Sequence, residues 1–167
     1  RNHKNLPRLI RAFNIIKSRR EFTDLKLVII GSKGWLYDDI FKEIENSNYR
    51  DHIVLKSFIP DQERKFYYSL AEVFVYPSLF EGFGFPPLEA MACGTPVIVS
   101  NGSSLPEIVG NAGLLIKPNN IDEIADLIGL ILTNRILRDR MVSLGCNRSI
   151  FFNWNKTAEQ TLNCLIS

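Results

Sequence analysis

Short apolar runs that end near glycine or proline alternate with amphipathic segments over residues 1–118, and this alternation constrains the fold more than any other feature. The runs lie at 25–31, 52–56, 73–76, 97–99 and 114–116. They are rich in Val, Ile and Leu without strict polar alternation, which is typical of strands buried on both faces. Helices are expected between them, over 6–16, 36–46, 60–70, 86–93 and 104–109. The pattern predicts an α/β domain with a Rossmann-like parallel sheet flanked by helices.

The remaining segments are predicted to be helical, over 121–132, 137–144 and 156–165. Asn5 stands where it could cap the first helix, and Pro7 falls in that helix's tolerant first turn. The 167 residues show no internal linker or repeat. We therefore expect one domain, 1–167.

Composition excludes several classes of protein. With 46% hydrophobic residues the chain can bury a core, and 20 Lys and Arg against 18 Asp and Glu leave a net charge of only +2. This balance argues against a protein that binds nucleic acid by bulk charge and against a polybasic membrane anchor. No apolar run approaches the roughly 18–20 residues of a membrane span. The 3 cysteines lack CxxC spacing, and with 2 histidines they favour free thiols in a reducing cytoplasm over a metal site.

The sequence that follows the run at 73–76 carries the clearest chemistry. Gly82 and Gly84 stand just before a helix that Pro86 begins, so backbone N–H groups and the helix N-terminus can approach an anion. Glu81 and Glu89 flank this turn, where carboxylates would accept hydrogen bonds from hydroxyls. Phosphate and hydroxyl groups together indicate a nucleotide sugar. The alternative is an ordinary turn with one solvated and one capping glutamate.

Here the chain resembles the group 1 retaining glycosyltransferases, which include glycogen synthases and bacterial mannosyltransferases. Glu81 to Glu89 has the E-x7-E spacing of that family. The similarity continues through almost the whole chain, in the segments 4–6, 9–13, 28–31, 33–35, 77–97, 105–107 and 152–158.

The resemblance implies one half of a GT-B fold, the C-terminal domain that binds the donor, with the N-terminal acceptor domain absent from this chain. The family has a strand directly before the segment that begins at Lys4, in the middle of the sheet. We therefore expect the sheet to lack its first strand and not to form six continuous strands from residues 1–167.

The resemblance also assigns roles. Glu81 would be the catalytic residue, binding donor-sugar hydroxyls without acting as a nucleophile, and Glu89 would hold the ribose. The amides of Gly82, Phe83 and Gly84 would contact sugar and phosphates, and Leu88 would lie near the ribose.

Lys4 matches the lysine that neutralises the pyrophosphate. Arg1 is the candidate for the family's arginine, although it lies only three residues before Lys4 and the family's arginine usually lies further upstream. Backbone groups near Phe58 and Ile59 would bind the base of the donor nucleotide. Other donor-site candidates, each with an ordinary structural role as its alternative, are Gly31, Lys33, Ser78 and Glu107.

The expected function is transfer of a hexose from a nucleoside diphosphate sugar, with a preference for GDP-mannose, to a glycan or lipid-linked acceptor. No metal or other cofactor is expected. The isolated domain should be inactive, and membrane contact at most peripheral. An inactive nucleotide-sugar-binding or regulatory module is the alternative. A dinucleotide oxidoreductase is disfavoured because the turn from Gly31 to Gly34 lacks GxGxxG spacing.

Overall fold

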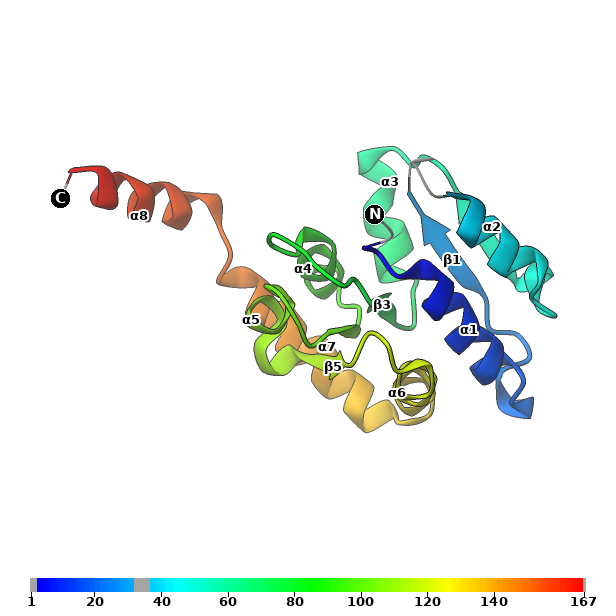
Figure 1. Cartoon of the computed structure of the whole chain (residues 1–167). Helices are drawn as coiled ribbons and strands as arrows, with labels where there is room; N and C mark the ends of the chain where they lie inside the picture. The colour runs from blue at the N-terminus through cyan, green and yellow to red at the C-terminus, as the bar shows by residue number, and fades with distance from the viewer. Residues whose placement is uncertain (1–2, 32–36, 167) are drawn as a thin grey trace.

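The structure is a computed structural model that describes residues 3–31 and 37–166. Helices and strands alternate as the sequence predicts (Figure 1). The alternating part consists of α1 (Leu6–Lys17), β1 (Leu27–Ile30), α2 (Tyr37–Glu45), β2 (Ile53–Lys56), α3 (Asp61–Ser69), β3 (Phe74–Tyr76), α4 (Phe85–Ala92), β4 (Val97–Ser100), α5 (Leu105–Val109) and β5 (Gly113–Ile116). The C-terminal part consists of α6 (Ile121–Thr133), α7 (Arg135–Ile150) and α8 (Trp154–Ile166).

Helix α7 is longer than the predicted helix over 137–144. It begins earlier because the Asn134 side chain accepts a hydrogen bond from the backbone N–H of Leu137 at 2.9 Å, which caps the helix. It continues past Gly145 because that glycine packs against α4. A Cβ atom at Gly145 would lie 3.2 Å from Met91 Cγ, so the missing side chain lets the two helices approach closely.

Within the described residues the strands form two parallel sheets, β1–β2 and β3–β4–β5. In this part of the chain no further strand pairs with the second edge of β1 or with the outer edge of β3. The predicted α/β class with parallel strands is therefore confirmed. The described residues do not build a continuous six-stranded sheet, so nothing in them contradicts the prediction that the first strand is missing.

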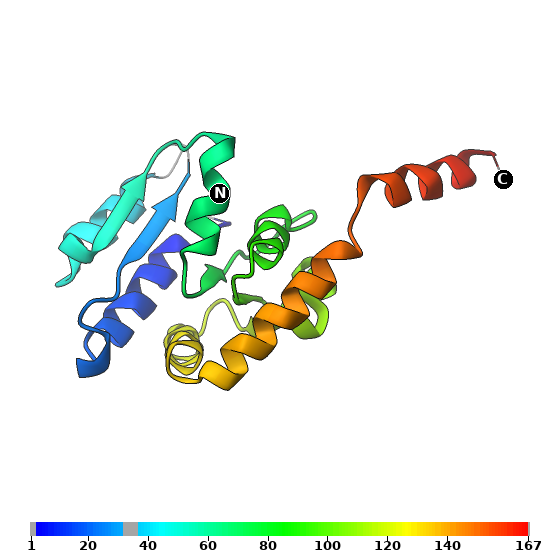
Figure 2. The same cartoon turned by 180° about the vertical axis from the view of Figure 1, so that it is seen from behind.

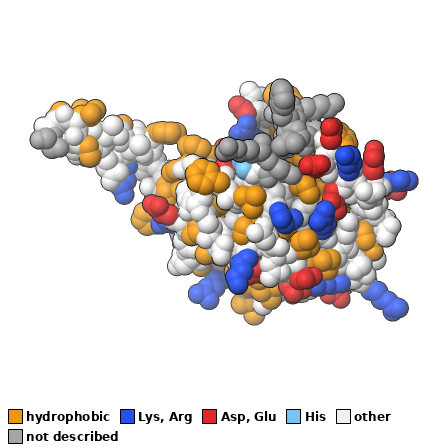
Figure 3. All heavy atoms as spheres, in the orientation of Figure 1, with side chains coloured by type: hydrophobic (Ala, Val, Ile, Leu, Met, Phe, Trp, Pro, Cys, Tyr) orange, Lys and Arg blue, Asp and Glu red, His pale blue; other side chains and the backbone are white. Residues whose placement is uncertain are grey.

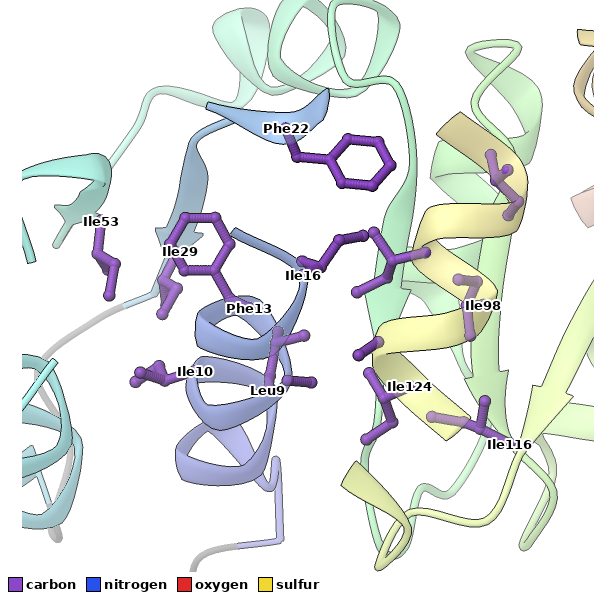
Figure 4. Packing of buried hydrophobic residues seen from close by; sticks show 14 of the residues in the cluster. Leu9, Ile10, Phe13, Ile16, Phe22, Ile29, Ile53, Ile98, Ile116 and Ile124 are labelled. Atoms are coloured by element: carbon purple, nitrogen blue, oxygen red, sulfur yellow. The ribbon is translucent and has the colours of Figure 1, made fainter. Parts of the chain in front are cut away.

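Helix α1 joins the two sheets through one hydrophobic core. Its apolar residues recur every three or four positions and point to both sides (Figure 4). Ile10 and Phe13 lie toward Ile29 of β1, whereas Ile16 points toward α6, where its Cδ1 atom would lie 3.5 Å from a Cβ atom at Gly129. A helix that packs on both sheets keeps them in one domain although no strand bridges them.

A second cluster of buried residues lies beneath α4 and α5, next to the glycine-rich turn. Its members are Ala90, Met91, Val97, Val99, Leu105, Ile108, Val109 and Ala112. This cluster holds the N-terminal end of α4 at the carboxyl end of β3, which is where ligands bind in open parallel sheets.

The expected role of Asn5 as a side-chain cap is wrong. Asn5 stands at the N-cap position with φ +57°, but its side chain does not cap α1. Its amide instead donates to the carbonyls of Pro77, at 3.1 Å, and of Pro118, at 2.6 Å. Asn5 is 2% exposed, and in this buried place its amide supplies the two loop carbonyls with the hydrogen-bond donor that buried polar groups require.

Helix α8 projects away from the rest of the molecule (Figures 1 and 2). None of its described residues is buried, and hydrophobic side chains are visible along it in Figure 3. Trp154, Leu162 and Leu165 are among the exposed ones. None of the helices in the described ranges combines the length and the hydropathy needed to cross a membrane.

Candidate donor-binding site

The loop that follows β3 lies against the first described residues of the chain. The backbone N–H of Leu79 donates to the carbonyl of His3 at 2.7 Å, and the hydroxyl of Ser78 reaches the same carbonyl at 2.9 Å. Ser78 is 1% exposed and also contacts the Glu81 carboxylate. Through these bonds, residues that are more than 70 positions apart in sequence meet at the carboxyl end of β3.

An ion pair between Lys4 and Glu81 stands at the centre of this region. The Lys4 Nζ atom lies 2.8 Å from Glu81 Oε1, and it also donates to the hydroxyl of Tyr76. Burial alone would raise the pKa of Glu81, but hydrogen bonds from Lys4, Ser78 and Tyr76 outweigh it and lower that pKa below its ordinary value. Glu81 is therefore an anion at neutral pH, with its oxygens held by three donors.

The glycine-rich turn is fixed by serines from the loop before α5. Gly84 precedes α4 with φ +124°, a conformation that glycine adopts readily and other residues rarely do. The backbone N–H of Glu81 donates to Ser103 Oγ at 3.0 Å, and the Ser104 hydroxyl donates to the carbonyls of Glu81, at 3.1 Å, and of Phe83. These bonds orient the turn while α4 supplies its N-terminal partial positive charge.

Glu89 lies on α4 and is held from α3. Its Oε2 atom accepts a hydrogen bond from the Tyr68 hydroxyl at 3.0 Å, and its Oε1 atom lies 3.5 Å from Arg64 Nη1. The side chain remains 38% exposed, so the carboxylate can still accept a hydroxyl from a ligand.

A hollow of about 700 Å³ adjoins the Lys4 region, between the starts of α1 and α2. Its described lining residues are His3, Asn5, Pro7, Arg8, Arg11, Asp39, Lys42, Glu43 and Leu79, and they do not include either motif glutamate. Arg11 is paired with Glu43 through two bonds of 2.9 and 2.8 Å. The hollow shows that the segments that follow β1 and β3 meet on one side of the molecule.

Comparison with known families identifies the chain. Residues 1–147 match the model of the group 1 glycosyl transferases. The chain belongs to this family. The resemblance inferred from the sequence is therefore confirmed.

Curated relatives include mannosyltransferases. The chain is 36% identical to O-antigen chain mannosyltransferase B of Escherichia coli over 160 residues, which cover 96% of this chain and 42% of that protein. It is 36% identical over 116 residues to MMP alpha-(1->4)-mannosyltransferase of Mycolicibacterium hassiacum, covering 67% of this chain and 28% of that protein. The chain thus spans less than half the length of these relatives.

Solved structures of the same fold include a sucrose-phosphate synthase from Thermosynechococcus elongatus. It has a TM-score of 0.86 and 29% identity, and the match covers 99% of this chain and 42% of that one. A structure of the C-terminal domain of a group 1 glycosyl transferase, LpcC from Francisella tularensis, has a TM-score of 0.79 and 25% identity and covers 90% of this chain and 80% of that one. Both agree with one Rossmann-like half of a GT-B fold.

The structure brings together only some of the residues predicted for the site. Lys4, Ser78 and Glu81 form one hydrogen-bonded cluster with the turn from Gly82 to Gly84 beside it. Leu88 packs against the buried cluster beneath α4.

The other candidates lie farther out or outside the described residues. Phe58 is 79% exposed in the loop between β2 and α3, and Ile59 is 8% exposed. The backbone N–H of Gly31 donates to the carbonyl of Lys56 at 3.0 Å. The Glu107 side chain is exposed, and its carbonyl accepts from Arg148 at 2.6 Å. The remaining two, Arg1 and Lys33, lie outside the described residues.

Sequence reasoning missed the side chains that hold the two glutamates. Arg64 and Tyr68 stand four residues apart, hence on one face of α3, a spacing that is visible in the sequence. Tyr76 is the last residue of β3, a position at which parallel strands commonly carry site residues. The serines at 103 and 104 give no such signal, because their role depends on the loop being folded back onto the turn.

Within residues 3–31 and 37–166, no group of three or more His, Cys, Asp or Glu side chains is placed to hold a metal ion. The expectation of a metal-independent reaction stays a prediction.

Proposed function

We propose that this chain is the donor-binding domain of a retaining hexosyltransferase, which takes a hexose from a nucleoside diphosphate sugar and passes it to a glycan or a lipid-linked acceptor. GDP-mannose is the proposed donor, because several relatives are named mannosyltransferases. The observation that carries the proposal is the pairing of Lys4 with Glu81 beside a glycine-rich helix start. The lysine and the backbone amides of the turn suit the phosphates of such a donor, and the carboxylate suits its hydroxyl groups.

Each group has a task in this proposal. The Lys4 ammonium exchanges part of its contact with Glu81 for the donor's diphosphate and stabilises the charge that grows on the leaving nucleoside diphosphate. Glu81 then accepts hydrogen bonds from the sugar hydroxyls, and Glu89 accepts them from the ribose. The amides of Gly82, Phe83 and Gly84 approach the phosphates and the sugar.

The proposal places the acceptor site outside this chain, on a further domain, because the chain spans 42% of O-antigen chain mannosyltransferase B. The isolated chain is therefore expected to bind the donor without transferring its sugar. A cytoplasmic location belongs to the same proposal. It agrees with the thiols of Cys93 and Cys146, which form no disulfide among the described residues and suit a reducing compartment.

Calorimetry on the 167-residue chain tests the binding function. GDP-mannose, UDP-glucose and NAD are titrated in parallel, with and without EDTA. We expect GDP-mannose to bind most tightly and EDTA to have no effect. Replacement of Lys4 by Ala should weaken binding of GDP about tenfold or more, and the same change at the exposed Lys117 serves as the control. Tight binding of NAD without binding of any nucleotide sugar would overturn the proposal.

A second experiment separates a transferase from an inactive binding module. In the longer polypeptide that contains this domain, Glu81→Gln should slow sugar transfer severely and leave binding of the nucleoside diphosphate close to normal. Wild-type turnover in that variant would refute the role of Glu81. Donor binding without any transfer by the unmodified longer polypeptide would favour the binding module.

A further inference from the structure

A tyrosine on α3 contacts one of the two motif glutamates. The Tyr68 hydroxyl donates to Glu89 Oε2 at 3.0 Å. The backbone beneath it is tied down as well, because Thr95 Oγ1 donates to the carbonyl of Tyr68 at 2.6 Å. Burial, followed by the charge of Glu89, raises the pKa of Tyr68, so its hydroxyl remains a donor at every physiological pH.

A tyrosine at the end of β3 contacts the other motif glutamate. The Tyr76 hydroxyl accepts from the Lys4 ammonium, and its own hydrogen is directed to Glu81. The Lys4 Nζ atom also lies 4.8 Å from the centre of the Tyr76 ring. Burial and then the charge of Glu81 raise the pKa of Tyr76, which keeps this phenol protonated too.

Phe74 lies between these tyrosines and connects them. The rings of Tyr68 and Phe74 meet edge to face, with centres 5.3 Å apart and planes at 82°. The rings of Phe74 and Tyr76 are stacked, with centres 5.8 Å apart and planes at 23°. Residues 74 and 76 share one face of β3 because side chains alternate along a strand. α3, β3 and α4 lie next to one another in Figures 1 and 2.

We propose that Tyr68 and Tyr76 are positioning residues of the donor site: the first fixes the carboxylate of Glu89 for the ribose, and the second fixes Glu81 and Lys4 for the sugar and phosphates. Phe74 holds both phenol rings, so the carboxylates are kept in one mutual arrangement. This inference rests on the proposed function and assigns two residues to which the sequence pattern gave no role in the site.

Without its tyrosine hydroxyl, each carboxylate would be held only by its remaining partners. Without the Tyr68 hydroxyl, Glu89 is left with Arg64, whose guanidinium is 3.5 Å away and also contacts Asp61. Without the Tyr76 hydroxyl, Glu81 is held by Lys4 and Ser78. The Lys4 side chain is 43% exposed, so water competes for its ammonium group. In both cases the carboxylate remains charged but loses one of the hydrogen bonds that fix its orientation, which weakens its hydrogen bonds to a ligand hydroxyl.

The experiment removes one hydroxyl at a time and keeps the rings. Tyr68→Phe and Tyr76→Phe are prepared in the 167-residue chain, with Tyr67→Phe as the matched control. Tyr67 is the neighbour of Tyr68 on α3 and makes no side-chain hydrogen bond among the described residues. The Kd values of GDP, 2′,3′-dideoxy-GDP and GDP-mannose are measured by calorimetry.

We expect Tyr68→Phe to weaken GDP and GDP-mannose equally, about tenfold, and to leave 2′,3′-dideoxy-GDP unchanged, because that ligand lacks the ribose hydroxyls. Tyr76→Phe should shift the ratio of the Kd for GDP-mannose to the Kd for GDP by about tenfold against the sugar. A merely structural role would weaken all three ligands in the same proportion.

The outcomes separate this inference from the proposed function. If the unmodified chain binds GDP-mannose and both variants bind all ligands as Tyr67→Phe does, the positioning roles are wrong and the proposed function stands. If Tyr68→Phe weakens 2′,3′-dideoxy-GDP as much as GDP, the link through Glu89 to the ribose is wrong. If the unmodified chain binds none of the ligands, both fail.

Discussion

Gly84 is the position at which a single added methyl group should reveal how tightly the turn is built. Its φ of +124° is rarely adopted by residues with a side chain, and a Cβ atom there would lie 3.0 Å from Leu105 Cδ2. The Leu105 side chain is fully buried, so it has little room to move. Gly82, two residues earlier, has neither constraint, since a Cβ atom there would meet no atom within 4 Å.

These two features set the size of the effect. Holding alanine in that conformation costs about 1–3 kcal/mol. Displacing Leu105 within a packed cluster adds at least about 1 kcal/mol. Gly84→Ala should therefore lower the free energy of unfolding by about 2–4 kcal/mol. Gly82→Ala should change it by less than about 0.5 kcal/mol.

Urea denaturation followed by circular dichroism measures both variants against the unmodified chain, with the slope m checked for constancy. Donor binding is measured on the same samples. We expect Gly84→Ala to lose stability. Gly82→Ala should keep its stability, and it should lose affinity for GDP-mannose if the donor approaches the amide at position 82 closely enough to meet the added methyl group. Equal stability of the two variants, within about 0.5 kcal/mol, would refute the strain calculated at Gly84.

Three further predictions test other parts of the structure. The pKa of Glu81 in the folded chain lies below its ordinary value of 4.5. The stability that this carboxylate contributes is therefore complete above pH 4.5 and should fall as the pH drops through the folded pKa. Glu81→Gln should reduce this loss of stability at acid pH in a series of denaturation curves. Asn5→Ala removes three hydrogen bonds from a buried amide, two that it donates and one that it accepts from Arg8, and leaves alanine at φ +57°. The change should cost about 2–4 kcal/mol in the same assay; an unchanged midpoint would contradict that structural role. The backbone N–H of Phe74 donates to β4, so the N–H of Val75, the next residue, points to the outer edge of β3. The Val75 N–H should therefore exchange with deuterium much faster than the N–H of Ile98 in the central strand β4. Equal protection of the two would mean that the outer edge of β3 is covered.

The sequence determines the order of the elements because each is specified locally. Short apolar runs rich in β-branched residues between turn residues favour strands, and apolar residues spaced three or four apart between them favour helices. The same local chemistry determines the glycine-rich turn, since Gly82, Gly84 and Pro86 constrain the backbone over a few residues. Glu81 and Glu89 belong to this local pattern and were predicted with their roles by resemblance.

The tertiary structure decided which side chains meet, because the partners come from distant parts of the chain. Lys4 pairs with Glu81, 77 positions away, and Asn5 joins two loops that are 72 and 113 positions from it. Tyr68 reaches Glu89 only because α3 packs beside α4. Local propensity carries no information about such pairs, since it acts within a turn of helix or a few residues of strand. What the sequence alone determined is a parallel α/β domain with a phosphate-suited turn; the folded chain decided that a lysine and two tyrosines hold the two carboxylates beside it.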